Sequence, residues 1–598
     1  MGERRGLQAR LERDWRFLGG LVRTLLRVRA VSAHSPDLMT DDLEAAVDRW
    51  RERPALSFDG KTLSFGDLDN LANRYAHWAE QSGLRRGDVV ALLMPNRLEY
   101  LPIWFGLSKV GIVTALINNQ LTGEALAHCV NVAGAAHCLV DEETGPALEA
   151  ARAQVDHAMQ VWNLGPAQGD QRDLAQALKS CGPLRPDRAR REGLAGADTA
   201  LYIFTSGTTG LPKAARITHM RARLYMRGFA GATGANEGDR IYVALPLYHA
   251  TGGLCAVGAA LLNGGSVVIR KHFSASRFWS DVAAEGCTMF VYIGELCRYL
   301  ATQAPVPEET QHRLRLAFGN GLRPEVWEKL VGRFAVPRVL EFYGSTEGNV
   351  SMFNFDGKLG AIGRAPRWLS FAFNIRLARF DVEAEAPVRG ADGRCIEAAV
   401  GEAGECLGEI KADARTAYVG YADKSASEKK VLRGAFRPGD AWFRTGDLLR
   451  KDREGYFYFV DRIGDTFRWK GENVSTGEVA GQLGEAPGVK EVNVYGVKVG
   501  DLDGRAGMAG LVVDAGFDPK AFAAFAAQRL PAYAQPVFLR LLPEIAVTGT
   551  FKPRKLDLVA AGFDPSAVKD PLYVRGPKGY QKLTRPLYAR IMSGEVRL

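Results

Sequence analysis

The sequence predicts an α/β protein, with a large N-terminal domain of layered sheets and helices followed by a small α+β C-terminal domain. At 598 residues the chain is too long for one hydrophobic core. From about residue 40 to Ile269, amphipathic helical patterns alternate with short apolar strands, which indicates mostly parallel sheets covered by helices. After Asp447 the pattern changes to short strands separated by polar, glycine-bearing stretches.

Individual segments support this order. Residues 68–79 read as an amphipathic helix, and residues 88–94 as a buried strand that stops at Pro95. Residues 165–197 are polar and contain Gly, Pro and Arg, so we expect a surface linker between two subdomains. Further strands are expected near the C-terminus, at residues 455–460, 492–497 and 510–513. The predicted domains are a basic N-terminal segment, the large domain and the C-terminal domain, over residues 1–40, 41–462 and 463–598.

Composition narrows the class of protein. Hydrophobic residues make up 46% and charged residues 24% of the chain, as in ordinary globular proteins. The net charge of +9 suits polyanionic ligands or an acidic membrane surface. With no arginine-glycine tract and no zinc-finger spacing, we expect no nucleic-acid partner. The eight cysteines form no CxxC pair, which favours buried apolar residues in a reducing compartment.

The first 30 residues carry eight arginines against three acidic residues. Several apolar side chains recur there at helical spacing, namely Trp15, Leu18, Val22, Leu25 and Leu26. One interpretation is an amphipathic helix on an anionic bilayer, and the other is a basic helix packed on the protein's own body. Arginines interrupt every apolar run, so we expect neither a secretory signal nor a spanning helix. The predicted location is cytoplasmic, or peripheral on the inner face of the cell membrane.

The most specific local signal is a strand at residues 201–204 that runs into a loop of hydroxyls and glycines. Glycines let backbone N–H groups approach phosphate oxygens, hydroxyls add donors, and a lysine adds positive charge. The spacing differs from that of a Walker A loop. The alternative is a glycine-rich surface loop without a ligand. The candidate phosphate-binding residues are Thr205, Ser206, Gly207, Thr208, Thr209, Gly210 and Lys213.

This loop resembles the signature of the adenylate-forming superfamily, which includes acyl-CoA synthetases, luciferases and peptide-synthetase adenylation domains. Four further segments resemble the family's later motifs in the family's order: residues 343–347, 444–447, 461–473 and 548–552. The resemblance covers roughly residues 40–590. The wording of these motifs is closest to fatty acid transport proteins and very-long-chain acyl-CoA synthetases, and the composition suggests a bacterial member. The family's fold has a small C-terminal domain that is mobile.

The resemblance implies a nucleotide site. The loop from Thr205 to Lys213 would hold the leaving pyrophosphate, Thr346 would bond the α-phosphate, and Glu347 would coordinate Mg²⁺. Asp447 would accept the ribose hydroxyls, and Arg462 would add a ribose or phosphate contact. The alternatives are that Glu347 is an exposed turn glutamate, that Asp447 belongs to an ordinary turn, and that Tyr343 is a core aromatic residue. The residues implied around adenine are Tyr343, Gly344 and Ser345 with the loop of Gly319, Asn320 and Gly321.

Further residues are implied for the acyl group and for the second step. His249 matches a position near the acyl carboxylate, although a hydrogen-bonded core histidine is the alternative. Lys552 would bridge carboxylate and α-phosphate in the first step only, unless it is a solvated lysine of a basic run. Gly464 stands where the family's hinge usually has Asp or Lys, and Phe551 replaces a usual Gly. Gly471 and its neighbours fit the use of coenzyme A.

The function implied is that of an ATP-dependent ligase with Mg²⁺ and coenzyme A. It would join a long- or very-long-chain fatty acid to AMP and then transfer the acyl group to the thiol of coenzyme A. Three alternatives stay open: transfer to a carrier protein, activation of sterol or bile-acid side chains, and a lipid-uptake protein that mainly serves transport. The sequence sets neither the chain length nor the oligomeric state.

Overall fold

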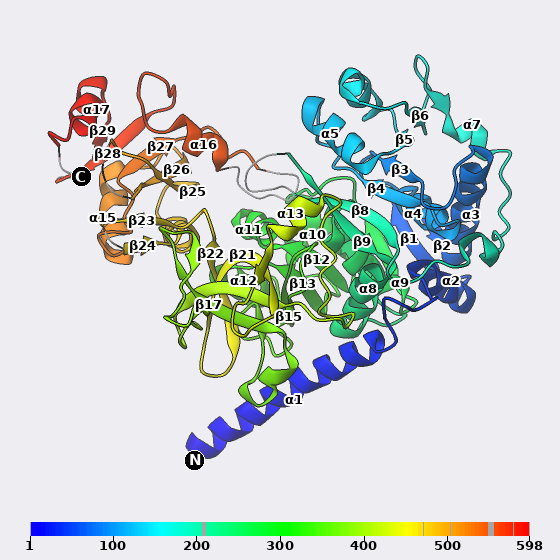
Figure 1. Ribbon diagram of the computed structural model, residues 1–598. Coiled ribbons are helices and arrows are strands. Elements are labelled where there is room, and N and C mark those ends of the chain that lie inside the picture. Colours follow the sequence, from blue (N-terminus) through cyan, green and yellow to red (C-terminus); the bar gives the residue numbers. More distant parts are fainter. Residues whose placement is uncertain are drawn as a thin grey trace. The chain divides into compact units, whose positions relative to one another are not determined.

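The computed structural model describes residues 2–205, 211–470, 472–500, 502, 504–547, 555–577, 579–596 and 598. The chain forms two compact units, which are described separately. Unit 1 comprises residues 1–364 and 409–431, and unit 2 comprises residues 365–408 and 432–598. Figure 1 shows helices and sheets layered within unit 1, which confirms the predicted α/β class.

Unit 1 contains a seven-stranded sheet of order β7-β6-β5-β3-β4-β8-β9. Its strands are parallel except for β9, which pairs antiparallel with β8. Helix α4 packs on α3 and β4, and α5 packs against β3 and β9. The elements are α3 Phe65–Gln81, β3 Val89–Leu92, α4 Tyr100–Lys109, β4 Val113–Leu116, α5 Gly123–Ala133, β5 His137–Val140, α6 Gly145–Ala151, β6 Gln160–Asn163, β7 Arg172–Asp173, α7 Leu174–Leu178, β8 Thr199–Thr205 and β9 Lys213–Thr218.

The second sheet of unit 1 has eight strands in the order β15-β14-β13-β12-β10-β11-β1-β2. Its inner strands are parallel, while β2 and β15 are antiparallel to their neighbours. The elements are α2 Met39–Trp50, β1 Pro54–Phe58, β2 Lys61–Ser64, α8 His219–Thr233, β10 Arg240–Val243, the π-helix η3 Thr251–Ala256, α9 Val257–Leu261, β11 Ser266–Ile269, α10 Phe278–Ala284, β12 Met289–Ile293, α11 Gly294–Thr302, β13 Leu316–Asn320, α12 Pro324–Gly332, β14 Val339–Gly344, β15 Ser351–Phe353 and α13 Lys424–Glu428.

The stretch 165–197 differs from its prediction as a linker between subdomains. It leads from β6 to β8, two strands of one sheet, and itself adds β7 and α7 to that region. Arg191 is buried in it and forms ion pairs with Asp41 (2.9 Å) and Glu44 of α2. A polar sequence therefore packs here because its arginine meets carboxylates that the rest of the chain supplies.

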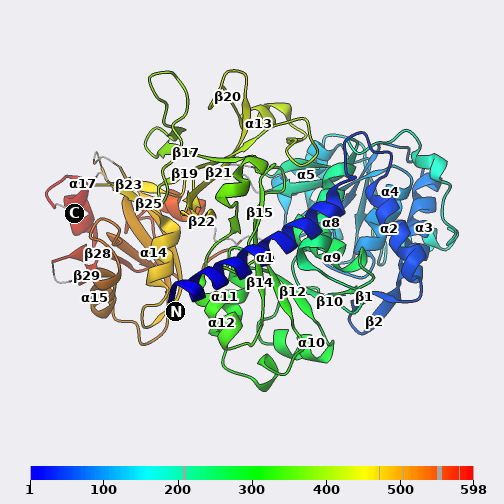
Figure 2. The ribbon, with the colours of Figure 1, turned by 90° about the horizontal axis from the view of Figure 1, so that it is seen from below.

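Helix α1 (Gly2–Val28) packs on α8, as Figure 2 shows. Phe17 is buried against Phe355, with ring centroids 5.9 Å apart, and Asp14 pairs with Arg364 at 2.7 Å. At Gly231 of α8, a Cβ atom would lie 2.7 Å from the backbone of Thr24, so only glycine permits this close approach. The helix thus packs on the body of unit 1 by one face.

The opposite side of α1 is apolar and exposed. Trp15 is 74% exposed there, although it is a large aromatic residue. The predicted helical spacing is confirmed, and the side chains that share this exposed stripe are Leu11, Trp15, Val22, Leu25 and Leu26. Among the described residues, none of the helices combines the length and the apolar character that crossing a bilayer requires.

Unit 2 begins with a small sheet in which β22, β21, β19, β17 and β18 are consecutive neighbours, with β20 beside β21. A β-hairpin and a five-stranded sheet of order β25-β26-β27-β28-β29 follow. The strands predicted at residues 455–460, 492–497 and 510–513 are confirmed by β22, β25 and β26. The elements are η5 Arg367–Ala372, β17 Ile375–Asp381, β18 Ala386–Pro387, β19 Ala403–Glu409, β20 Val431–Arg433, β21 Ala441–Lys451, β22 Tyr456–Arg462, β23 Phe467–Trp469, β24 Glu472–Val474, α14 Thr476–Leu483, β25 Val489–Val497, β26 Ala506–Val513, α15 Pro519–Arg529, β27 Phe538–Leu541, α16 Leu556–Ala561, β28 Leu572–Gly576, β29 Gly579–Lys582 and α17 Arg585–Met592.

Several expectations about single residues are confirmed. All eight cysteines are buried and free. The predicted helix 68–79 lies within α3, and the predicted strand 88–94 contains β3. The boundary predicted at residues 462 and 463 stays a prediction.

Candidate nucleotide site

The loop after β14 carries Ser345, Thr346 and Glu347, and a buried arginine fixes its backbone. Arg221 lies in the first turn of α8, where Thr218 caps the helix by accepting from the Arg221 N–H (3.2 Å). The guanidinium donates to the carbonyl oxygens of Thr346 (2.8 Å), Ser345 (3.1 Å) and Gly348. These bonds set where the side chains of the loop stand.

Tyr225, one turn further along α8, completes this support. Its hydroxyl accepts from Arg221 (2.7 Å) and lies 3.1 Å from the carbonyl oxygens of both Ser345 and Thr346. Burial raises the pKa of Tyr225, so the phenol keeps the proton that it donates. Two side chains of α8 therefore hold the backbone of Thr346, the residue that is predicted to bind the α-phosphate.

The carboxylate of Glu347 accepts a hydrogen bond from the hydroxyl of Tyr421 (2.9 Å). Tyr421 belongs to the segment 409–431, which returns to unit 1 and forms a bridge to Ala215 of β9. Burial and the neighbouring Glu347 raise the pKa of Tyr421 far above its usual range, while a hydrogen bond from Thr205 opposes the shift. The Nζ of Lys213 lies 5.7 Å from the centre of the Tyr421 ring. Tyr421 thus connects the predicted metal ligand with both ends of the predicted phosphate loop.

The two ends of that loop are neighbours in the sheet. Thr205 ends β8, Lys213 begins β9, and the two residues pair across the strands. The hairpin therefore places Lys213 beside Thr205. The residues between them that the sequence predicts to bind phosphate, Ser206, Gly207, Thr208, Thr209 and Gly210, lie outside the described residues.

The predicted adenine loop runs from Gly319 to Leu322 at the end of β13. It passes so close to β12 and α11 that two glycines are required: a Cβ at Gly319 would lie 2.1 Å from the Tyr292 carbonyl oxygen, and a Cβ at Gly294 would lie 1.7 Å from that of Gly321. Gly321 also has φ +79°, a left-handed conformation that favours glycine.

A buried carboxylic acid holds the same loop. Glu341 of β14 accepts from the Leu322 N–H (3.0 Å) and from the Tyr292 hydroxyl (2.5 Å). Burial raises the pKa of Glu341 to about 8, and hydrogen bonds from Tyr292, Leu322 and Gly321 oppose the shift. Glu341 lies two residues before Tyr343, so one strand both fixes the adenine loop and presents the predicted adenine-stacking ring.

His249 lies two residues before the π-helix η3, in a turn that Asn96 fixes. The Asn96 side chain accepts from the Leu247 N–H (2.8 Å) and donates to the Leu245 carbonyl (2.9 Å). The His249 ring contacts Tyr248, with centroids 4.5 Å apart, and is half-buried. π-Helices are rare and occur often at functional sites. The role of His249 near the acyl carboxylate stays a prediction.

In unit 2 the predicted ribose residues face each other across two strands. Asp447 of β21 pairs with Arg462 of β22, and the Arg462 Nε lies 3.8 Å from the Asp447 Oδ1. The Thr445 hydroxyl donates to the Cys406 carbonyl (2.8 Å) and accepts from the Asp447 N–H (3.1 Å), which fixes the turn before Asp447.

The predicted hinge Gly464 follows β22 in an exposed turn with φ +92°. Contacts bridge this turn: Asp461 accepts from the Thr476 N–H (2.6 Å) and hydroxyl (3.0 Å), and Ser475 donates to the Val460 carbonyl (2.9 Å). A rotation about Gly464 would have to break these bonds. Gly471 and Lys552, predicted for coenzyme A and for catalysis, lie outside the described residues.

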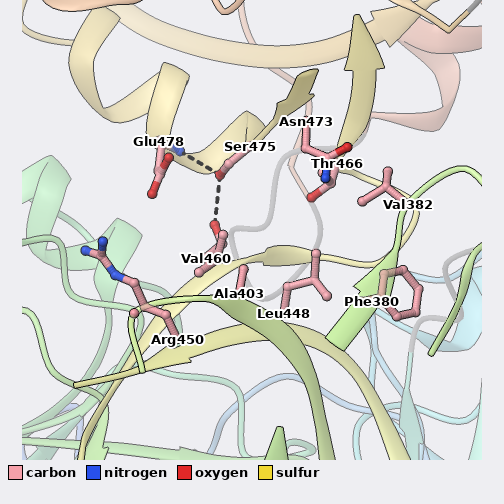
Figure 3. Close-up of a pocket in the computed structure, with 11 residues that line it drawn as sticks. Phe380, Val382, Ala403, Leu448, Arg450, Val460, Thr466, Asn473, Ser475 and Glu478 are labelled. Atoms are coloured by element: carbon pink, nitrogen blue, oxygen red, sulfur yellow. Dashed lines mark hydrogen bonds between the residues drawn. The ribbon is translucent and has the colours of Figure 1, made fainter. Parts of the chain in front are cut away.

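A cavity of about 240 Å³ lies beside this hinge (Figure 3). Strands of the small sheet line one side with apolar groups, among them Phe380, Leu448 and Val460. Asn473, Ser475 and Glu478 line the other side from β24 and α14, and the bond from Ser475 to Val460 joins the two sides. The cavity thus lies between the small sheet and the segment of residues 473–478.

Four residues of the candidate site escaped the sequence reasoning: Arg221, Tyr225, Glu341 and Tyr421. Each acts by a bond to a residue more than 18 positions away or by burial, and only the fold creates these relations. One signal was present, because Glu341 stands in an otherwise apolar strand, where a carboxyl group needs hydrogen-bonding partners.

Glu341 predicts a pH-dependent stability. Its native pKa of about 8 exceeds the usual 4.5, so its contribution to stability is complete below about pH 4.5 and is lost as pH rises through 8. The unfolding free energy should fall less steeply between pH 5 and 8 in E341Q, which stays neutral, by up to about 1.4 kcal/mol per pH unit. Thermal unfolding of wild type and variant across this range measures it. The exposed Glu328→Gln variant should keep the wild-type slope, and an E341Q slope equal to wild type would contradict the prediction.

The site can be compared with known proteins. The family described as AMP-binding enzyme matches residues 43–393, and the AMP-binding enzyme C-terminal domain matches residues 478–552. Long-chain fatty acid transport protein 6 of Mus musculus is 40% identical over 570 residues, which cover 93% of this chain and 91% of that protein. Long-chain fatty acid transport protein 1 of Homo sapiens is 40% identical over 600 residues, which cover 98% and 92%.

Solved structures share the fold at lower identity. The anthranilate CoA ligase AuaEII, in complex with anthranoyl-AMP, gives a TM-score of 0.76 at 21% identity and covers 90% of this chain and 100% of its own. ATP-bound MatB from Rhodopseudomonas palustris gives 0.72 at 22% identity, with 87% and 98% covered. These likenesses confirm the predicted adenylate-forming fold. With a family match over more than half its length and relatives at 40% identity along nearly all of it, the chain belongs to the AMP-binding enzymes, in the group of the long-chain fatty acid transport proteins.

Proposed function

We propose that this chain converts long- and very-long-chain fatty acids into their coenzyme A thioesters. One observation carries the proposal: the match to a long-chain fatty acid transport protein extends over 98% of the chain and 92% of that relative. As an AMP-binding enzyme, the chain is an AMP-forming acyl-CoA synthetase that uses ATP, Mg²⁺ and coenzyme A. Uptake of fatty acids would then follow from trapping the acid as its thioester.

The first step is limited by charge repulsion. A fatty carboxylate is already ionised near neutral pH, since carboxyl pKa values lie around 4, and it must approach the α-phosphate of a polyanion. Two like charges about 4 Å apart near a protein surface repel by roughly 4 kcal/mol. The site must therefore supply cations and oriented N–H groups. We assign the pyrophosphate to the loop between Thr205 and Lys213, and the α-phosphate to Thr346.

The described residues fit a magnesium ion. Among them no cluster of three or more His, Cys, Asp or Glu side chains forms a metal cage, and Mg²⁺ typically takes one or two carboxylates with phosphate oxygens. We assign it to Glu347, whose Oε1 is oriented by Tyr421. When bound, the ion would neutralise charge on the phosphates. The same proposal places adenine against Tyr343 to Ser345 and the loop of Gly319 to Gly321, ribose at Asp447 and Arg462, and the acyl carboxylate near His249.

The second step needs a different arrangement, because pyrophosphate must leave and a thiol must reach the acyl carbonyl. We assign the change to a rotation at Gly464, which has a left-handed φ and open space where a Cβ atom would stand. Such a rotation would carry Lys552 away and bring the segment of Gly471 toward the acyl-adenylate. A carrier-protein thiol could replace coenzyme A at the same step, and a sterol or bile-acid side chain could replace the fatty acid.

The products and the metal ligand can be tested together. We expect ATP-dependent release of AMP and pyrophosphate, with thioester formation only when coenzyme A is added, and a preference for long-chain acids across a panel that includes bile acids. Glu347→Ala should lower turnover by at least about a hundredfold, because removal of one charge-stabilising group typically costs that much. The exposed Glu328→Ala variant is the matched control. ADP as product would contradict the proposed reaction class. A preference for bile acids would contradict the proposed fatty acid substrate.

The support of the Thr346 loop can also be tested. Arg221→Lys keeps the charge but reaches fewer carbonyl oxygens, so we expect turnover to fall by about ten- to a hundredfold as the loop shifts. Tyr225→Phe should have a smaller effect of the same kind. Arg216→Lys is the control, because the Arg216 side chain of β9 bonds to Thr199 of β8 and not to the loop of Thr346. Unchanged turnover in Arg221→Lys would remove Arg221 from the site.

The two steps should separate by mutation. We expect Lys552→Ala to abolish formation of acyl-adenylate while thioester formation from pre-made acyl-adenylate stays within about tenfold of wild type. Gly464→Pro fixes φ near −65° and should do the reverse, releasing pyrophosphate in one turnover and then stalling. The exposed Lys569→Ala should change neither step. Equal loss in both assays for both variants would argue for one rigid site.

We also propose that α1 rests on an anionic membrane surface through its exposed apolar stripe. Arginines flank this stripe: Arg16 directly follows Trp15, and Arg23 directly follows Val22. Burial lowers the pKa of Arg338 on the body, and crowding by Arg23, Arg315 and Arg16 adds to the shift. Lipid phosphates would relieve this crowding. A peripheral position on the inner face of the membrane would follow.

The stripe can be removed without touching the packed face of α1. We expect Trp15→Ser with Val22→Ser and Leu26→Ser to weaken flotation with phosphatidylglycerol-containing vesicles by at least about tenfold, because apolar area is lost from the contact. Activity on a soluble short-chain acid should stay at the wild-type level. Leu184→Ser, at a residue 78% exposed in unit 1, is the matched control. Equal flotation of the triple variant and wild type would return α1 to a packing role.

A further inference from the structure

A second exposed aromatic segment lies in unit 2, on the short helix η5. Phe371 is 82% exposed, more than any other large hydrophobic side chain among the described residues, and Trp368 beside it is 51% exposed. Aromatic side chains carry large apolar areas and are normally covered. Two such rings within one turn therefore need a partner that takes up apolar area.

The charge around this segment indicates the kind of partner. Residues 357–380 contain five basic residues and no Asp or Glu, although Arg364 among them is buried and pairs with Asp14 (2.7 Å) and Asp356 (3.0 Å). Arg379 pairs with Glu402 (2.8 Å), and the guanidinium of Arg376 stacks on the Phe436 ring at 4.9 Å. Arg367 is exposed directly beside Trp368. Burial lowers the pKa of the half-buried Lys451. The nearby Glu397 raises this pKa, and the charge of Arg367 lowers it further.

We propose that residues 367–373 form a second contact with an anionic phospholipid surface, separate from α1. Trp368 and Phe371 would enter the boundary between headgroups and acyl chains, where amphipathic aromatic rings are enriched, and Arg367 would face the lipid phosphates. An exposed arginine beside two exposed rings favours this partner, because a phospholipid surface offers phosphates and apolar chains together. This inference rests on the proposed function in one respect: a water-insoluble fatty acid would reach the enzyme from a membrane.

A single labelled position tests the contact directly. All eight native cysteines are buried, so a cysteine introduced as Phe371→Cys in the full chain reacts selectively with an environment-sensitive nitrobenzoxadiazole probe. We expect its emission to rise at least twofold and shift to shorter wavelength with vesicles of phosphatidylcholine and phosphatidylglycerol at three to one, and far less with phosphatidylcholine alone. Val400→Cys is the matched control, because Val400 is 61% exposed in the same unit but lies between Glu397 and Glu402.

A second variant keeps the inference testable without a label. Trp368→Ser with Phe371→Ser should weaken vesicle flotation by about tenfold relative to Val400→Ser and leave turnover of a soluble short-chain acid unchanged. An unchanged probe signal with anionic vesicles would overturn the proposal. So would a signal that rises with protein concentration in the absence of lipid, which would indicate a second copy as the partner. A vesicle-dependent signal in a preparation without ligase activity would retain this surface and reject the proposed function instead.

Discussion

Arg221 binds three carbonyl oxygens of the loop that follows β14, and the candidate chemistry depends on this contact. Main-chain carbonyls in a tight loop repel one another, and a planar guanidinium with several donors can satisfy them together. The loop that carries Thr346 and Glu347 is thereby held in one shape. Tyr225 adds its hydroxyl from the next turn of α8. A rigid helix, rather than the loop itself, thus sets the position of the proposed phosphate and metal contacts.

A second constraint is close backbone approach. The adenine loop runs against β12 and α11 at distances that exclude any Cβ at Gly319 or Gly294. Glu341 accepts a hydrogen bond from the Leu322 N–H of the same loop, and burial keeps its carboxyl group protonated near neutral pH. The nucleotide base would therefore meet a surface made mainly of backbone, which leaves room for a flat ring. Tyr343, on the same strand as Glu341, is placed by the same register.

The proposed hinge at Gly464 would provide the opposite property, freedom to move. Bonds from Thr476 to Asp461 and from Ser475 to Val460 hold the present arrangement, and the proposed rotation would break them. The proposed lipid contacts on α1 and η5 lie away from this turn in the sequence, at residues 11–26 and 367–373. Both combine exposed aromatic rings with arginines, which suits an enzyme whose substrate partitions into membranes.

The sequence by itself determined the α/β class, the strands near the C-terminus, the burial of the cysteines and the family, because these follow from local periodicity and from motifs read in order. It also determined the identities of Thr346, Glu347 and Asp447 as candidates. Only the tertiary structure decided that Arg221 and Tyr421 serve them, and that the polar stretch 165–197 returns to one sheet. The physical reason is distance along the chain: a hydrogen bond between residues more than 70 positions apart leaves no periodic trace in the sequence, and it exists only once the fold has brought both groups out of water together.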